Sequence, residues 1–87
     1  MDLNELLKNK LYRGIVEFFH ENQTSVDTPR GIATWVKEER AVVKNALDKL
    51  VELGILIAHE VSSTTGYSYT RNKKIIQTIE KQLKNNR

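Results

Sequence analysis

Apolar residues in the first quarter of the chain recur at four-residue steps, and they are Leu3, Leu7, Leu11, Ile15 and Phe19. This spacing places the apolar side chains on one face of an α-helix. We therefore predict a helix over residues 3–21. Asp2 and Glu5 have the spacing of a capping box at its start. Gly14 lies inside the helix, where glycine costs about 1 kcal/mol relative to alanine, and it therefore suggests a close contact with another helix.

A second helix is predicted from Thr28. Thr28 is a suitable N-cap, and Pro29 occupies the first helical position, where its missing N–H group does no harm. Ile32, Ala33 and Val36 give this helix an inward face, with Trp35 beside it and half buried. Residues 37–39 form the turn that follows.

A third helix is predicted over residues 39–53. Its inward face is apolar, and Gly54 ends it. The residues sharing that face are Val43, Ala46, Leu47, Leu50 and Leu53. The opposite face carries Ala41, Lys44, Asn45, Asp48 and Glu52, with Arg40, Val42 and Lys49 at its flanks.

The next segment is rich in β-branched residues. Residues 55–61 are predicted to form a strand, residues 62–66 a loop, and residues 67–70 a return strand with alternating tyrosines. Val26 is expected to form a short β-bridge. Asn72 is suited to cap a final helix, whose apolar stripe is Ile75, Ile76, Ile79 and Leu83. The prediction is a single, mainly α-helical domain over residues 1–87 with a small β-hairpin.

Charge is distributed unevenly in this chain of 87 residues with a net charge of +3. Residues 71–87 contain six basic residues and one acidic residue, whereas residues 28–54 contain five and four. This basic balance favours an anionic partner. The chain has no cysteine, which excludes disulfides and thiolate metal sites. It has no long apolar run and no signal-peptide pattern at its start, so we expect a cytoplasmic protein that does not contact a membrane.

No motif predicts catalysis. The chain lacks a glycine-rich phosphate loop, a nucleophile with a matching base and a pair of carboxylates that suits acid–base chemistry. His20 and His59 stand alone, without acidic or histidine neighbours at metal-ligand spacing. We therefore expect a protein that is not an enzyme and that binds neither a metal nor a cofactor.

The order of these elements resembles the winged helix-turn-helix domain of bacterial and archaeal transcription regulators, broadly the MarR, ArsR and PadR kinds. Ile32-Ala33 in the second helix carries the resemblance, together with the spacing of Val43, Leu47, Leu50 and Gly54. The strand-loop-strand segment ending in Tyr67-Ser68-Tyr69-Thr70 completes it. The resemblance covers about residues 10–71. It implies a winged-helix fold and binding to double-stranded DNA, with helix 39–53 in the major groove and wing 55–71 on the adjacent backbone.

Carried over to this chain, the resemblance implies a set of DNA-contacting residues. Arginine can bind guanine and asparagine can bind adenine through two hydrogen bonds, and small apolar side chains can touch a thymine methyl group. At a helix start, backbone N–H groups and the helix dipole favour phosphate. The implied DNA-contacting residues are Thr28, Arg30, Arg40, Ala41, Val42, Lys44, Asn45, Thr64, Thr65 and Arg71.

Two further expectations concern partners. A terminal helix that follows the wing often pairs with a second protomer, so we expect a homodimer through the first and last helices, which implies a palindromic DNA site. The alternative function is a winged-helix protein–protein interaction module without specific DNA binding. The acidic residues at Glu38, Glu39, Asp48 and Glu52 favour this alternative.

Overall fold

The computed structural model describes residues 2–85, apart from the side chain of Val61. The helices of this part of the chain are α1 (Leu3–Leu6), α2 (Lys10–Glu21), α3 (Pro29–Val36), α4 (Arg40–Glu52) and α5 (Lys73–Asn85). The strands are β1 (Val26–Asp27), β2 (Leu56–Val61) and β3 (Thr64–Tyr69). The predicted order of helices and hairpin is therefore confirmed.

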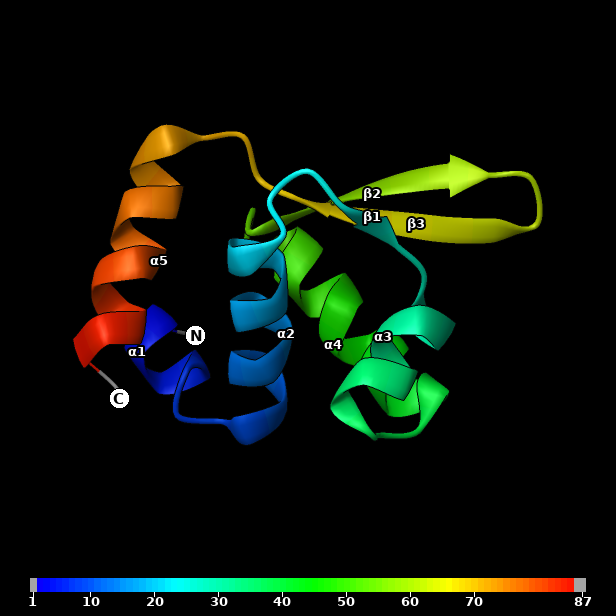
Figure 1. Ribbon diagram of the computed structural model, residues 1–87, viewed down its shortest axis with the longest axis horizontal. Helices are drawn as coiled ribbons and strands as arrows, with labels where there is room; N and C mark the ends of the chain where they lie inside the picture. The colour runs from blue at the N-terminus through cyan, green and yellow to red at the C-terminus, as the bar shows by residue number, and fades with distance from the viewer. Residues whose placement is uncertain (1, 86–87) are drawn as a thin grey trace.

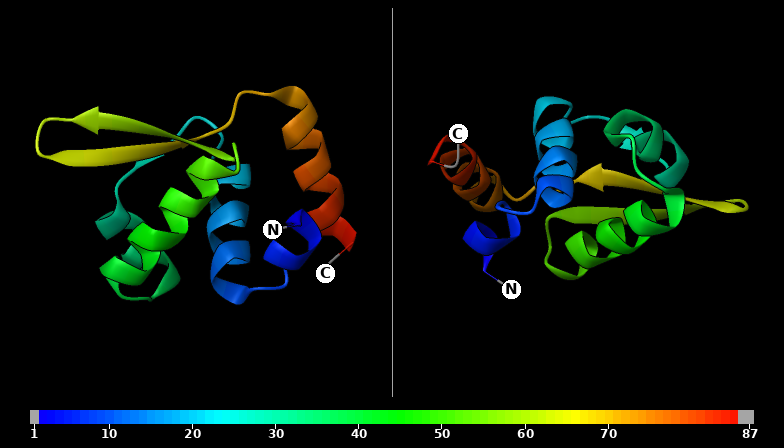
Figure 2. Two further views of the ribbon diagram at one scale, coloured as in Figure 1. Left: turned by 180° about the vertical axis from the view of Figure 1, so that it is seen from behind. Right: turned by 90° about the horizontal axis from the view of Figure 1, so that it is seen from below.

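The elements divide between two ends of an elongated molecule, which measures 37 × 25 × 22 Å. The hairpin of β2 and β3, here called the wing, projects at one end beside α3 and α4 (Figure 1). At the other end α5 lies against α1, and both ends of the chain are found there (Figures 1 and 2). Helix α2 lies between these groups and contacts α3, α4, α5 and β3.

The predicted helix over residues 3–21 is wrong in one respect, because the chain breaks between α1 and α2. The side-chain oxygen of Asn9 accepts hydrogen bonds from the backbone N–H groups of Leu11 and Tyr12, at 3.0 and 3.2 Å. An N-cap of this kind starts a new helix. The predicted capping box is also wrong, since Asp2 is the N-cap of α1 but its side chain makes no capping hydrogen bond.

Strand β3 is the centre of a three-stranded antiparallel sheet in the order β1-β3-β2. Val26 pairs with Ser68 and Asp27 with Tyr67, so the predicted bridge is extended by one residue. The inward side chains of β3, Tyr67 and Tyr69, are both fully or almost fully buried. The sheet therefore closes over the helices and completes one hydrophobic core.

The turn of the wing is tighter than the predicted loop over residues 62–66. Val61 pairs with Thr64, which leaves only Ser62 and Ser63 to connect the strands. Ser62 has a φ of +53°, and two-residue hairpins need positive φ at the first turn position. The hydroxyl residues Thr64 and Thr65 therefore belong to β3, where cross-strand hydrogen bonds hold their backbone.

The helix-turn-helix segment forms with small shifts in its bounds. Glu39 is the N-cap of α4, which therefore starts one residue later than predicted. Val43, Ala46, Leu47 and Leu50 are buried as expected, and Asn72 caps α5 by accepting hydrogen bonds from Lys74 and Ile75. The prediction for Trp35 is wrong, because its side chain lies outside the core with 63% of its surface exposed.

Two residues with positive φ lie on either side of α4, one in the turn before it and one directly after its C-cap. Lys37 (φ +60°) is the left-handed C-cap of α3, and Gly54 (φ +78°) follows α4 with nothing near the position of an added Cβ. Because only glycine avoids the steric cost of this conformation, we expect Lys37→Gly to raise the free energy of unfolding by about 0.5–1 kcal/mol. Gly54→Ala should lower it by about 1–2 kcal/mol. Chemical denaturation measures both, and the same sign for the two variants would contradict the explanation.

Candidate nucleic-acid interface

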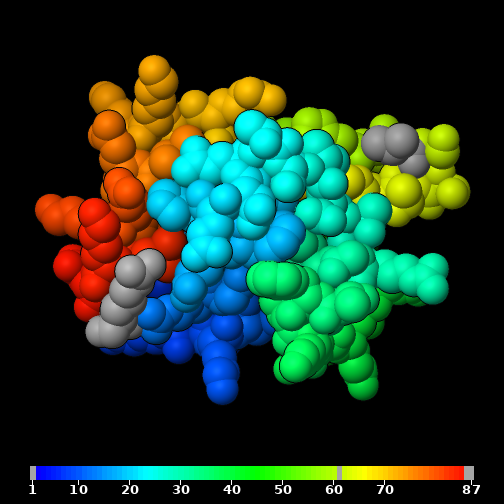
Figure 3. Space-filling view, viewed as in Figure 1, coloured from blue at the N-terminus to red at the C-terminus, as the bar shows by residue number. Residues whose placement is uncertain are grey.

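A groove of about 640 Å³ lies between the starts of α3 and α4 and the tip of the wing. In the space-filling view the wing and the α3–α4 region stand apart, with a notch between them (Figure 3). The groove is lined by Thr28, Pro29, Arg30, Arg40, Ala41, Lys44, Ser63, Thr64 and Thr65. Seven of the ten residues predicted to contact DNA therefore share one surface, although they come from three separate segments.

The start of α3 forms one side of this groove. The Thr28 hydroxyl accepts a hydrogen bond from the Gly31 N–H group at 3.2 Å and so caps the helix, as predicted. The cap leaves the hydroxyl hydrogen free to donate to an anion. Arg30 follows directly and is exposed, and no ion pair holds its guanidinium within residues 2–85. This side of the groove can therefore receive a phosphate group.

The first turn of α4 forms the floor of the groove. Arg40 and Ala41 are exposed there, and Arg40 has no ion-pair partner in the described part of the chain. Val42 and Asn45 are also exposed on α4, but they do not line the groove. With Lys44, the N-terminal half of α4 thus presents three polar side chains and two small apolar ones to solvent.

The wing residues that line the groove contribute hydroxyl groups and no charge. Ser63, Thr64 and Thr65 line the groove, and Ser63 lies in the turn that the predicted loop already contained. Arg71 does not join them, since it lines a different hollow of about 400 Å³ beside Gln23, Thr24 and Lys73. Contact of Arg71 with the same stretch of DNA stays a prediction.

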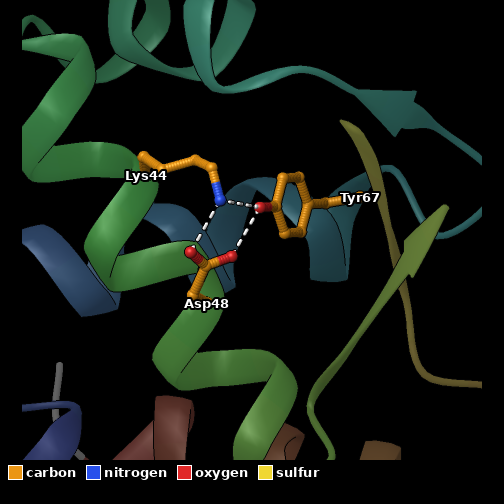
Figure 4. A network of polar contacts seen from close by, with 3 residues as sticks. All are labelled: Lys44, Asp48 and Tyr67. Atoms are coloured by element: carbon orange, nitrogen blue, oxygen red, sulfur yellow. Dashed lines mark hydrogen bonds and ion pairs between the residues drawn. The ribbon is translucent and has the colours of Figure 1, made fainter. Parts of the chain in front are cut away.

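A polar network of three side chains ties the wing to α4 (Figure 4). The Lys44 ammonium donates to Asp48 Oδ2 at 2.7 Å and to the Tyr67 hydroxyl at 3.1 Å. The Tyr67 hydroxyl donates to Asp48 Oδ1 at 2.6 Å. Each of the three side chains is thus hydrogen-bonded to the other two. Because Tyr67 lies in the middle of β3, the network fixes the position of the wing relative to α4.

The network also shifts the protonation of its members. The hydrogen bond from Lys44, and then that from Tyr67, holds the pKa of Asp48 below its ordinary value of 3.8. The hydrogen bond to Asp48 raises the pKa of Lys44, while burial raises the pKa of Tyr67. Lys44 is therefore charged at neutral pH, but much of its charge is neutralised by Asp48.

Sequence reasoning assigned Lys44 to DNA and did not find the network. Asp48 lies one helical turn after Lys44, which is a common spacing for an ion pair. Tyr67, however, is 23 positions from Lys44, and only the register of the wing brings its hydroxyl there. The i, i+4 spacing was the one available signal, and it indicates the ion pair but not the tyrosine.

Both histidines form side-chain contacts with hydroxyl groups. His20 Nδ1 lies 3.1 Å from the Tyr69 hydroxyl, and His59 Nε2 lies 2.7 Å from Ser68 Oγ across the wing. Residues 2–85 contain no group of three or more histidine, cysteine or acidic side chains that could hold a metal ion. Among the same residues, no helix is long and apolar enough to cross a membrane.

Removal of the Tyr67 hydroxyl tests how much the network stabilises the fold. We expect Tyr67→Phe to lower the free energy of unfolding by about 1–3 kcal/mol, because the hydroxyl's hydrogen bonds with the charged groups of Lys44 and Asp48 are both lost while the aromatic ring stays packed. Tyr12→Phe is the control, since the Tyr12 ring also packs against the core and its hydroxyl is not part of the network. Equal stability losses in the two variants would contradict a role for the network.

The pKa of Asp48 gives a second test, based on pH. A carboxyl group whose pKa is lower in the folded state stabilises the fold above its unfolded pKa, and this contribution disappears as the pH falls through the folded-state pKa. Asp48→Asn should therefore be less stable than the wild type at neutral pH, and the difference should shrink as the pH falls below 3.8. Urea denaturation over a pH series measures it, and a difference independent of pH would rule the explanation out.

Comparison with known proteins bears on the fold. No family model matches the chain, and no curated protein matches it. Among solved structures, the chain is similar to HlyU from Vibrio cholerae N16961, with a TM-score of 0.73 and 13% sequence identity, over 90% of this chain and 80% of that chain. At this identity the likeness concerns the fold alone. Together with the order of the helices and the hairpin, it shows a winged-helix fold.

Proposed function

We propose that the protein is a DNA-binding transcriptional regulator that places α4 in the major groove and the wing on the adjacent backbone. The observation that carries this proposal is the groove between α3, α4 and the wing, because it gathers four hydroxyl side chains and two arginines that form no ion pair within residues 2–85. Arginine and hydroxyl side chains donate hydrogen bonds to phosphate oxygens in protein–DNA complexes, and arginine also binds the edge of guanine.

The positions of these residues divide their roles. Thr28 and Arg30 stand at the start of α3, where backbone N–H groups and the helix dipole favour phosphate. Arg40, Ala41, Val42 and Asn45 lie on the exposed face of the first half of α4, which suits contact with base edges. Thr64 and Thr65 supply neutral hydrogen-bond donors for the backbone beside the wing. We also propose that Arg71, although it lies outside the groove, contacts a phosphate group.

We propose a mixed role for Lys44. Its ammonium group is bound to Asp48 and Tyr67, yet 46% of its side chain is exposed toward the groove. A lysine ammonium has three N–H donors, and the network uses two of them. We therefore propose that Lys44 chiefly positions the wing and offers its third donor to the DNA backbone.

The proposal includes a homodimer formed through α1 and α5. These helices contact each other within the chain, and much of their apolar surface is buried there. A hollow of about 270 Å³ remains open between them, with walls that are mostly apolar. Its lining residues are Leu3, Leu6, Leu53, Ile55, Lys74, Ile75, Thr78 and Ile79. This hollow supports pairing with a second protomer at that end of the molecule, away from the wing.

Substitution of the two groove arginines tests the proposed roles. Arg30→Ala should weaken binding to all duplexes and reduce the slope of log K against log salt by about 0.9, because one phosphate contact is lost. Arg40→Ala should cost about 1–3 kcal/mol on the preferred site and relax its sequence preference. Arg13→Ala is the control, because Arg13 lies on α2, pairs with Glu17 and does not line the groove. Fluorescence anisotropy over a salt series measures the affinity of the three variants for duplex DNA. If the wild-type protein binds no duplex at low salt, the proposal is wrong.

Selection from a random duplex library tests the symmetry. Two protomers related by a two-fold axis require half-sites about 10 base pairs apart in a palindrome. We expect such a palindrome to be enriched. Enrichment of a single, asymmetric half-site would argue against the dimer but not against DNA binding. A pull-down tests the interaction-module alternative. A protein partner that stays bound after nuclease treatment, and that also binds a variant with reversed charge at Arg40, would support that alternative.

A further inference from the structure

A second surface, unrelated to the proposed DNA groove, lies between the start of α2 and the end of α3. Its residues are Lys10, Leu11, Gly14, Trp35, Val36 and Glu38, and we call it the Trp35 surface. They surround a hollow of about 400 Å³. In Figure 1 these segments lie at the edge of the molecule away from the sheet. None of these residues lines the groove between α3, α4 and the wing.

Trp35 is the main apolar feature of this surface. It is the single tryptophan of the chain, and 63% of it is exposed. Its ring packs against Phe18 at a centroid distance of 5.5 Å, so the indole is held in place although it faces solvent. Tryptophan, together with tyrosine and arginine, is enriched among the few side chains that contribute most of the binding energy at protein interfaces. Exposing an indole ring to solvent stabilises neither the fold nor the protein in solution, so its exposure indicates a binding role.

Gly14 keeps the hollow open. An added Cβ at this position would lie 3.7 Å from the nearest atom, Val36 Cγ1, which is an ordinary packing distance. The contact between α2 and α3 therefore does not require glycine, although glycine inside a helix is unfavourable. The predicted close contact at Gly14 thus has room for a methyl group. The missing side chain instead leaves space beside Trp35.

The charges at the rim of the surface are self-complementary. Lys10 comes from α2 and Glu38 from the turn after α3, and neither has an ion-pair partner within the described residues. In a two-fold contact each patch meets the same patch of the other copy. Lys10 of one copy can then face Glu38 of the other, and the reverse pair forms by symmetry.

We propose that the Trp35 surface binds the Trp35 surface of a second copy of this chain. The indole of each copy fills the space beside Gly14 of the other, and two Lys10–Glu38 pairs flank the contact. This contact is separate from the proposed dimer through α1 and α5, and it does not depend on DNA. A protomer that pairs through both faces can join more than two copies.

Trp35 supplies its own probe for the first test. Burial of the indole between two copies shifts its fluorescence emission to shorter wavelength, so the emission of the purified protein should shift as its concentration rises from about 1 µM to 1 mM, the range of weak contacts. This signal reads the Trp35 surface whichever other faces associate. A partner of another sequence would leave the emission of the purified chain independent of concentration, which overturns the proposal.

Charge reversal gives the sharper test. Lys10→Glu alone and Glu38→Lys alone each place like charges opposite one another, and each should weaken self-association at this surface at least about tenfold. The two single variants mixed together, and the double variant alone, restore opposite charges and should associate like the wild type. Analytical ultracentrifugation together with Trp35 emission measures this. Failure of the mixture and of the double variant to recover would overturn the pairing.

Two further variants separate association from folding. Gly14→Ala should raise the melting temperature, because alanine is the better helix former, while it weakens association by filling the hollow. Trp35→Ala should abolish association at this surface, whereas Thr34→Ala, an exposed neighbour on α3, should not change it. Unchanged association in both Gly14→Ala and Trp35→Ala would show that this surface does not pair two copies.

Discussion

The hydrogen-bonded contact among Lys44, Asp48 and Tyr67 is the interaction on which the geometry of the groove depends. A two-stranded hairpin is only marginally stable by itself, so its direction must be set by what it packs against. Tyr67 fixes the middle of β3 to α4, and two positions later Tyr69 meets His20 of α2 at 3.1 Å. One strand is therefore attached to two helices, and the wing keeps its place beside the start of α4.

Most of the fold could be predicted from the sequence, because local patterns determine it. Thr28, Pro29 and Asn72 mark helix starts by their own chemistry, and the apolar spacing in α4 gives its buried face. The four-residue repeat continues through the break between α1 and α2 and so does not indicate it, whereas the Asn9 side chain caps the start of a new helix by local hydrogen bonds. The turn of the wing was predicted too long, because Ser62 adopts positive φ without the usual Gly or Asn.

The candidate site was less accessible to sequence reasoning. Exposed faces of helices carry no periodic signal that separates a binding residue from a solvated one. The hollow that Trp35 borders, and the separation of Arg71 from the groove, arise from packing between segments far apart in the chain. Lys44 shows most clearly why the sequence alone does not predict the binding residues. Its side chain has the length and charge of a phosphate contact, but a carboxylate one turn away and a distant hydroxyl already compete for its hydrogen bonds.

The pairing of β1 with β3 also has a consequence for how the protein folds. Val26 pairs with Ser68, and the chain between them contains α3, α4 and the whole of β2. Contacts between residues so distant in sequence close large loops, and they form late because their entropic cost comes before their gain. The contact between α3 and α4 is local in sequence and can form early. The side of the groove that the wing forms appears only when the sheet has assembled. The groove is therefore complete only after the sheet has formed, although both helices that border it belong to one local segment.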